Sequence, residues 1–228
     1  MTNETLSRRL TTYRVASMDM TILLLDVDGV LQFYDERLEA HFKSAFTWNT
    51  SHRDFLMELF ADPEYPLAQT GEADFLKVIE RILPGHVEVP DAEFYLDTWL
   101  KSEAQYNDAL LDLLPKLPTA YLATNQDSYR GKLIAVHYAP HFEGAFVSYQ
   151  MGVRKPAVAY FEYILEQLGV SPEQCTFVDD NQPNVDAGEA AGIRSILFQS
   201  NEQLFAEFES IGILSRNDGA FQPTSDQN

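Results

Sequence analysis

Four short clusters of polar residues in this sequence contain the side chains that could do chemistry. They are Asp26 and Asp28 in "TILLLDVDGVL", Thr124 with Asn125, Arg154 with Lys155, and Asp179 with Asp180. Crowded carboxylates resist ionisation unless a cation compensates their charge, and a site made only of oxygen ligands suits a hard cation, above all Mg²⁺. A lysine beside that metal acts as a point charge for an anionic substrate. A carboxylate nucleophile combined with a metal is a route to an aspartyl-phosphate intermediate.

The elements that must position these clusters are predicted by apolar runs. Continuous apolar runs are typical of strands covered on both faces, and they occupy residues 21–25, 119–125, 144–149, 175–180 and 194–199. Helical spacing lies between the later runs, at residues 157–169 and 183–192. This alternation predicts an α/β fold in which helices cover both faces of a parallel sheet. Because ligands of such sheets bind beyond the carboxyl ends of the strands, we expect the four clusters to converge on one rim.

Residues 35–105 interrupt the alternation. They contain no convincing strand and show helical spacing in four stretches separated by prolines. An insertion of roughly 70 residues is far longer than an ordinary connection, so we expect an inserted helical subdomain. The expected organisation is an N-terminal extension at 1–19, an α/β core at 20–34 and 106–214, and a disordered polar tail at 215–228.

Composition excludes several functional classes. The 228 residues carry 16 Lys and Arg against 35 Asp and Glu, a formal net charge of -19. Such an acidic balance argues against a protein that binds along a nucleic-acid backbone and against one that docks on anionic membranes. The single cysteine, Cys175, cannot form an intramolecular disulfide and is expected to be a small core residue. Without a signal peptide or an apolar run of about 20 residues, the expected location is the cytoplasm.

Four stretches of this chain resemble a known set of motifs. "LLLDVDGVL", "LATNQ", "VRKP" and "FVDDNQPNVDAG" are similar to the four motifs of the haloacid dehalogenase superfamily, in the family's order. Each motif alone is weak, but all four follow predicted strands in the right order. The resemblance implies a Rossmann-like core, and residues 35–105 lie where the family places its helical type of cap.

The resemblance also implies catalytic roles for the two carboxylates of the first motif. Asp26 would be the nucleophile that attacks phosphorus, and Asp28 would protonate the leaving oxygen and then activate water. Gly29 would allow the chain to turn tightly towards the cap. Family members that cleave carbon–halogen bonds lack an aspartate at the position of Asp28. An acid for the leaving alkoxide typically contributes about 10²- to 10⁴-fold in rate, so Asp28 favours phosphate-ester chemistry.

The remaining motifs imply binding roles. Thr124 and the Asn125 amide would hold phosphate oxygens, and Lys155 would neutralise charge between the nucleophile and the phosphate. The implied Mg²⁺ site consists of Asp26, the backbone carbonyl of Asp28, Asp180 as a direct ligand, and Asp179 acting through water or as an orienting group. The implied partner is a small phosphorylated molecule.

Other interpretations remain open at this stage. The paired aspartates could be turn residues, and Thr124, Asn125 and the later aspartates could be helix caps. Our leading hypothesis is a Mg²⁺-dependent phosphatase acting on a small metabolite such as a sugar phosphate or a nucleoside monophosphate. A phosphomutase using the same intermediate is the second hypothesis, and a non-catalytic binding protein of the same fold is the third. A dehalogenase is disfavoured by Asp28. The sequence leaves the substrate and the oligomeric state open.

Overall fold

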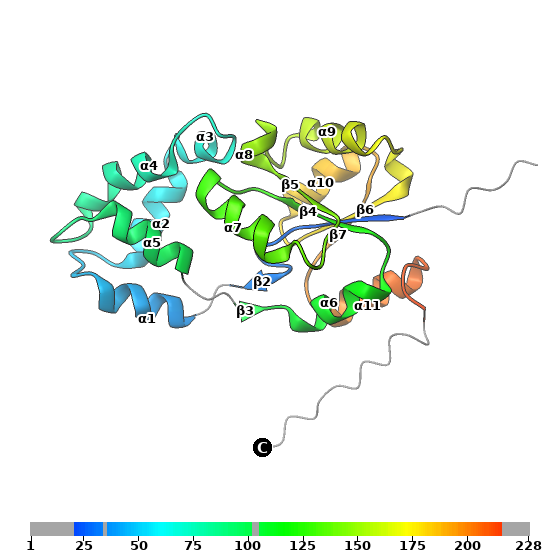
Figure 1. Ribbon diagram of the computed structural model, residues 1–228, viewed down its shortest axis with the longest axis horizontal. Coiled ribbons are helices and arrows are strands. Elements are labelled where there is room, and N and C mark those ends of the chain that lie inside the picture. Colours follow the sequence, from blue (N-terminus) through cyan, green and yellow to red (C-terminus); the bar gives the residue numbers. More distant parts are fainter. Residues whose placement is uncertain (1–20, 34–35, 102–104, 216–228) are drawn as a thin grey trace, which may run out of the picture.

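The computed structural model describes residues 21–33, 36–101 and 105–215. The predicted N-terminal extension and residues 216–228 of the predicted tail lie outside this part of the chain. Within it, the architecture is a parallel sheet enclosed by helices, with a separate group of helices beside one end of the sheet (Figure 1). The predicted α/β class is therefore confirmed. No helix in the described ranges is both long and apolar enough to cross a membrane.

The central sheet has five parallel strands in the order β5-β4-β1-β6-β7. Their bounds are Ile22–Leu25 (β1), Ala120–Thr124 (β4), Gly144–Val147 (β5), Cys175–Asp179 (β6) and Arg194–Leu197 (β7). The predicted strands agree with these to within a few residues, except that Ser148 and Tyr149 begin a helix. All four residues of β1 are buried, because this central strand is covered on both faces.

Two apolar cores lie on opposite faces of the sheet, because side chains alternate along each strand. Leu23 and Leu25 of β1 belong to one core, and Ile22 and Leu24 belong to the other. The first core is completed by helices α6 (Asp108–Leu113), α7 (Ser128–Tyr138) and α11 (Asn201–Ser210). The second is completed by α9 (Val158–Leu168) and α10 (Gln182–Ala190). Figure 1 shows α9 and α10 above the sheet and α6 and α11 below it.

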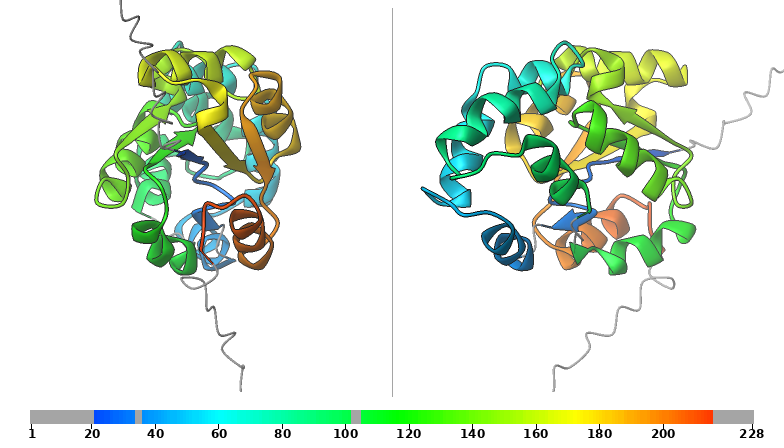
Figure 2. Two further views of the ribbon diagram at one scale, coloured as in Figure 1. Left: turned by 90° about the vertical axis from the view of Figure 1, so that its right-hand side faces the viewer. Right: turned by 60° about the vertical axis from the view of Figure 1, so that its left-hand side comes forward.

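A group of five helices, here called the helical region, occupies residues 36–101. They are α1 (Glu36–Ala45), α2 (His52–Ala61), α3 (Tyr65–Gln69), α4 (Phe75–Ile82) and α5 (Ala92–Lys101). Their apolar faces share a core of their own, which includes Phe55, Val78 and Tyr95. The right-hand view in Figure 2 shows this region standing to one side of the sheet. A self-contained core allows the region to keep its shape independently of the sheet.

A short strand pair that the sequence did not predict joins the two parts. β2 (Gln32–Phe33) pairs antiparallel with β3 (Gln105–Tyr106), so the chain enters and leaves the helical region along adjacent strands. The expectation that residues 35–105 contain no strand is therefore wrong at its last residue. Two-residue strands are too short to produce a detectable period, which is why the sequence does not reveal them.

Candidate active site

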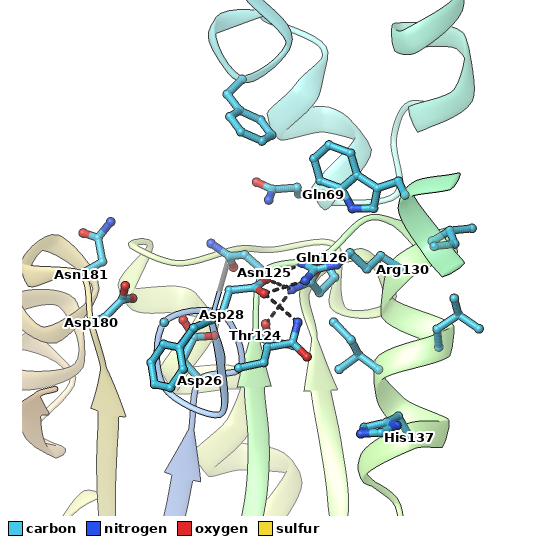
Figure 3. A pocket seen from close by; sticks show the side chains of 18 of the residues that line it. Asp26, Asp28, Gln69, Thr124, Asn125, Gln126, Arg130, His137, Asp180 and Asn181 are labelled. Carbon is cyan, nitrogen blue, oxygen red and sulfur yellow. Dashed lines mark hydrogen bonds and ion pairs between the residues drawn. The ribbon is translucent and has the colours of Figure 1, made fainter. Parts of the chain in front are cut away.

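The carboxyl ends of β1, β4 and β6 meet at the rim that faces the helical region (Figure 3). Asp26 follows the last residue of β1, Thr124 ends β4, and Asp179 ends β6. Asp26 still belongs to the sheet, because its N–H donates to the carbonyl of Val178 at 3.0 Å. The pairing of strands from distant parts of the chain thus brings the sequence-predicted residues together.

Lys155 is a buried cation at the centre of this rim, with only 1% of its surface exposed. Its Nζ lies 3.0 Å from Asp26 Oδ1 and 2.5 Å from Asp179 Oδ2, and it donates to the Ala123 carbonyl at 2.8 Å. Burial alone lowers the pKa of Lys155, but the two carboxylates outweigh it and the net shift is upwards. The ammonium is therefore charged at neutral pH.

Asn125 holds the backbone of Lys155 in place. Its side-chain NH₂ donates to the Lys155 carbonyl at 2.9 Å, and its side-chain oxygen accepts from the Lys155 N–H at 2.9 Å. The Asn125 side chain thus positions the lysine. Its NH₂ group keeps a second hydrogen, and the residue lines the cavity, so it can also contact a substrate.

Asp26, Asp179 and Asp180 form a cluster of carboxylates that could hold a cation. One oxygen from each lies within 4.8 Å of the others. Burial raises the pKa of Asp26 to about 8, even though Lys155 opposes that shift. Partial desolvation of the carboxylate, and next the charge of Asp179, also raise the pKa of Asp180. The surplus of buried carboxylates over cations fits a hard divalent ion such as Mg²⁺, which accepts oxygen ligands.

Asp179 and Asp180 differ in their surroundings. Asp179 is fully buried and accepts hydrogen bonds from the Asn181 N–H and from the Asn184 side chain, both at 2.9 Å. Asp180 is exposed and lies against Gly29, where a Cβ atom would come within 2.0 Å of Asp180 Oδ2. Asp180 is thus the more accessible ligand, whereas Asp179 is held by neighbouring side chains. Asn184 was not predicted from the sequence.

Asp28 faces a different set of partners. Arg130 of α7 binds both of its oxygens, at 2.5 and 2.6 Å, and Gln126 and Gln32 donate to it at 2.7 and 2.9 Å. Burial raises the pKa of Asp28, but the charge of Arg130 and these hydrogen bonds outweigh it, so the net shift is downwards. In this arrangement the Asp28 side chain is an ion-pair partner of Arg130.

Sequence reasoning missed Arg130, Gln126 and Gln32. Gln126 lies within the "LATNQ" motif, and its amide also donates to Thr124 Oγ1 at 3.1 Å. Arg130 lies in the first turn of α7, and its backbone N–H is capped by the Asp127 carboxylate. An aspartate N-cap indicates where this helix begins, but no local pattern pairs Gln126 or Arg130 with Asp28. Gln32 belongs to the unpredicted strand β2 and had no such signal.

A cavity of about 910 Å³ opens above the rim and extends to the helical region (Figure 3). Its floor contains Asp26, Asp28, Thr124, Lys155 and Asp180. Its opposite wall comes from α1, α2, α3 and α5, and Figure 3 shows Gln69 on that side, above Gln126. The predicted site residues other than Asp179 therefore line a space large enough for a small organic molecule.

Comparisons with known proteins agree with this geometry. The family model described as haloacid dehalogenase-like hydrolase matches residues 20–192. Among curated proteins, a drimenol cyclase of Aspergillus calidoustus is 36% identical over 70 residues, which are 31% of this chain and 13% of that protein. A sesquiterpene phosphatase of Aspergillus oryzae is 33% identical over 98 residues, 41% of this chain and 49% of that protein. A flavin mononucleotide hydrolase of Arabidopsis thaliana is 31% identical over 68 residues, 30% of this chain and 28% of that protein. Each match thus spans less than half of the relative's own length.

Solved structures show the same fold. The HAD family enzyme BT-2542 of Bacteroides thetaiotaomicron superimposes with a TM-score of 0.66 at 22% identity, covering 82% of this chain and 98% of that one. A second structure of that enzyme, in complex with magnesium and inorganic phosphate, gives a TM-score of 0.65 at 23% identity, with 82% and 99% covered. At this level of sequence identity, the structural similarity establishes the fold and nothing further.

Gly29→Ala is predicted to disrupt the cation cluster, with Gly152→Ala as the matched control. Both glycines have positive φ, +84° and +71°, so each alanine costs about 1–2 kcal/mol of backbone strain. Only Gly29 lies against Asp180, whereas nothing lies within 4 Å of the Gly152 position. We expect similar losses in urea unfolding but at least about tenfold weaker Mg²⁺ binding for Gly29→Ala alone. Equal Mg²⁺ affinities of the two variants would contradict this account of the turn.

Cation binding is predicted to release a proton from Asp26. Burial raises the pKa of Asp26 in the metal-free protein, and any proton that the carboxyl holds must leave when a cation binds. The apparent Mg²⁺ affinity should therefore rise as pH increases from 6 to 8. Calorimetry at pH 7 in two buffers of different ionisation enthalpy would count the released protons. We expect more released protons for the native protein than for Asp26→Asn.

Proposed function

We propose that this chain, which belongs to the haloacid dehalogenase-like hydrolase family, is a Mg²⁺-dependent phosphatase that hydrolyses a small phosphomonoester. The observation that carries the proposal is the position of Asp26, at the floor of the cavity with the Lys155 ammonium 3.0 Å away and further carboxylates beside it. A buried nucleophile, a fixed cation and a metal-binding cluster are the parts that phosphoryl transfer requires. The names of the A. oryzae and A. thaliana relatives support hydrolysis of phosphate esters.

In the proposed first step, an oxygen of ionised Asp26 attacks phosphorus and the bond to the leaving oxygen breaks. Lys155 neutralises charge between the carboxylate and the phosphate. The Thr124 hydroxyl and the Asn125 backbone N–H bind phosphate oxygens at the end of β4. The cation, held by Asp26, Asp180 and the Asp28 carbonyl and supported by Asp179, would supply charge compensation for the phosphate.

Asp28 is the proposed acid and base of the reaction. It gives a proton to the leaving alkoxide and later takes one from the water that hydrolyses the acyl phosphate. Its bidentate pair with Arg130 opposes the first of these tasks, since it stabilises the ionised carboxylate. We therefore infer that Asp28 turns away from Arg130 when substrate enters. Both groups line the same cavity, so the substrate can reach this pair directly.

The helical region would serve as the cap of this site. Eight of its residues line the cavity opposite Asp26, and closing a site in this way excludes bulk water from the reaction.

Several expectations from the sequence stay predictions. They are the domain limits, the cytoplasmic location and the lack of nucleic-acid or membrane partners. A phosphomutase that uses the same intermediate stays the second hypothesis.

Asp26→Asn is predicted to abolish hydrolysis of p-nitrophenyl phosphate. The amide cannot form the acyl phosphate, so we expect a loss of about 10³-fold or more in kcat, and EDTA should remove the activity of the native enzyme. Asp97→Asn is the control, because Asp97 is an exposed carboxylate of α5 that pairs with Lys101. Turnover by Asp26→Asn at the native rate, or full activity in EDTA, would refute the proposed chemistry.

Arg130→Met is predicted to shift the pH profile of kcat/KM. Arg130 lowers the pKa of Asp28, so removing its charge should raise that pKa and keep the acid protonated to higher pH. The alkaline limb should move to higher pH, whereas Arg130→Lys, which keeps the charge, should move it less. A rise in KM without any movement of the limb would instead assign Arg130 to phosphate binding.

A further inference from the structure

The cavity above the rim has two chemically different ends. Among the residues whose side chains the structure describes, every Asp, Lys and Arg that lines it belongs to the floor or to the adjacent part of α7, namely Asp26, Asp28, Asp180, Lys155 and Arg130. The described part of the helical region contributes eight lining residues, and none of these eight is Asp, Glu, Lys or Arg. The part of the substrate beyond the phosphate therefore meets these eight residues without meeting an acidic or basic side chain among them.

That wall is largely aromatic and aliphatic. Its main members are Phe42, Phe60, Tyr65, Trp99 and Leu100 from the helical region, with Leu133 from α7. The rings contact one another, since Phe60 lies 5.1 Å from Tyr65 and 6.3 Å from Trp99 between centroids. The cavity volume of about 910 Å³ lies near the upper end of small-molecule sites, which span roughly 300–1,000 Å³.

Exposed apolar side chains gather at this cavity. Nine large apolar residues in the described ranges are exposed, and four of them line it: Phe60, Tyr106, Leu133 and Val136. Phe60 is 46% exposed and Val136 is 76% exposed. Contiguous exposed apolar surface is unfavourable in water, and where it occurs it commonly marks a binding groove.

The wall offers few hydrogen-bonding groups to a polar substrate. His52 is already paired with the Tyr95 hydroxyl at 2.8 Å. Gln69 donates to the Tyr65 hydroxyl at 3.2 Å, and its carbonyl oxygen is buried without a partner among the described residues. The Gln69 amide and the Tyr65 hydroxyl are thus the described groups of this wall with hydrogen-bonding capacity to spare, which is little for the several hydroxyls of a sugar, and unpaired polar groups are costly to bury.

We propose that the leaving group is a largely apolar alcohol, so that the substrate is an alkyl or isoprenoid monophosphate rather than a sugar phosphate or a nucleotide. This rests on the proposed phosphatase function and narrows its substrate class. The names of the relatives leave that class open, because a sesquiterpene phosphate and a flavin nucleotide differ in polarity. The phosphate lies at the charged floor, and the hydrocarbon chain lies along Phe60, Trp99 and Leu133.

The first test measures binding, which does not depend on turnover. Methyl-, butyl-, hexyl- and octylphosphonate are titrated into the Mg²⁺-loaded native protein by calorimetry, below the concentrations at which they form micelles. Each buried methylene should tighten Kd by about fourfold, until the chain fills the cavity. A Kd that does not change with chain length overturns the proposal. In a parallel activity assay, glucose 6-phosphate hydrolysed with a higher kcat/KM than octyl phosphate also overturns it.

Matched variants test the wall itself. Phe60→Ser removes a ring from the cavity, whereas Met57→Ser changes an exposed apolar residue of the same helix that does not line it. Phe60→Ser should weaken octylphosphonate binding about tenfold, and methylphosphonate binding by much less. Met57→Ser should bind octylphosphonate as the native protein does. Leu133→Ser probes the same wall from α7, so a folding defect of one variant does not decide the result. Equal effects of Phe60→Ser and Met57→Ser would overturn the assignment of the wall.

The two proposals fail in different ways. Activity on p-nitrophenyl phosphate that does not need Asp26 would refute the phosphatase mechanism. The phosphonate series would still report whether the cavity accepts an apolar chain. Conversely, activity that depends on Asp26, together with a phosphonate Kd that does not change with chain length, would support the phosphatase function and refute the apolar substrate class.

Discussion

The buried ammonium of Lys155 is the constraint on which the rest of the site depends. A charged side chain of a residue with only 1% of its surface exposed is tolerated only when it is paired. The partners of Lys155 come from three neighbouring strands: Asp26 after β1, Ala123 of β4 and Asp179 of β6. Removing one partner of a buried ion pair typically costs about 3–5 kcal/mol. The lysine therefore ties the carboxyl ends of these strands together, while Asn125 holds the lysine's own backbone.

This arrangement leaves one carboxylate more than Lys155 can neutralise. The imbalance appears as the raised pKa of Asp26, the residue at the open floor of the cavity. A cation would relieve the same imbalance, and so would a proton. Strain of this kind is expected at functional sites, where groups that repel one another are held together by the surrounding fold. The close approach of Gly29 to Asp180 is part of the same crowding, because a side chain at position 29 would collide with the Asp180 carboxylate.

The chemistry and the choice of substrate are carried by separate parts of the molecule. The sheet rim holds the charged groups, and their geometry depends on strand pairing. The helical region holds an apolar core of its own and an apolar wall that faces the rim. Arg130 lies between them on α7, where both terminal nitrogens of its guanidinium, Nη1 and Nη2, donate to Asp28. A substrate that fills the cavity would meet the wall, the arginine and the nucleophile at once.

The sequence by itself determined the α/β class and the residues of the rim. Buried parallel strands are continuous apolar runs, and the rule that their carboxyl ends share an edge places Asp26, Thr124 and Asp179 together. Helical spacing likewise indicated α1, α2, α4 and α5 between the first two strands of the sheet. These features depend on local periodicity and on one topological rule, so they can be read from neighbouring residues.

Only the tertiary structure decided which side chains pair and what the cavity is made of. Arg130 and Asp28 are separated by 102 positions, and no local pattern joins them. The two-residue strands that bring in Gln32 are stabilised by their mutual pairing and by the chain around them. The apolar wall combines residues of four helices with residues of α7, and apolar side chains at helical spacing look the same whether they fill a core or line a cavity. Burial depends on what packs opposite a residue, and that is set by contacts between distant segments.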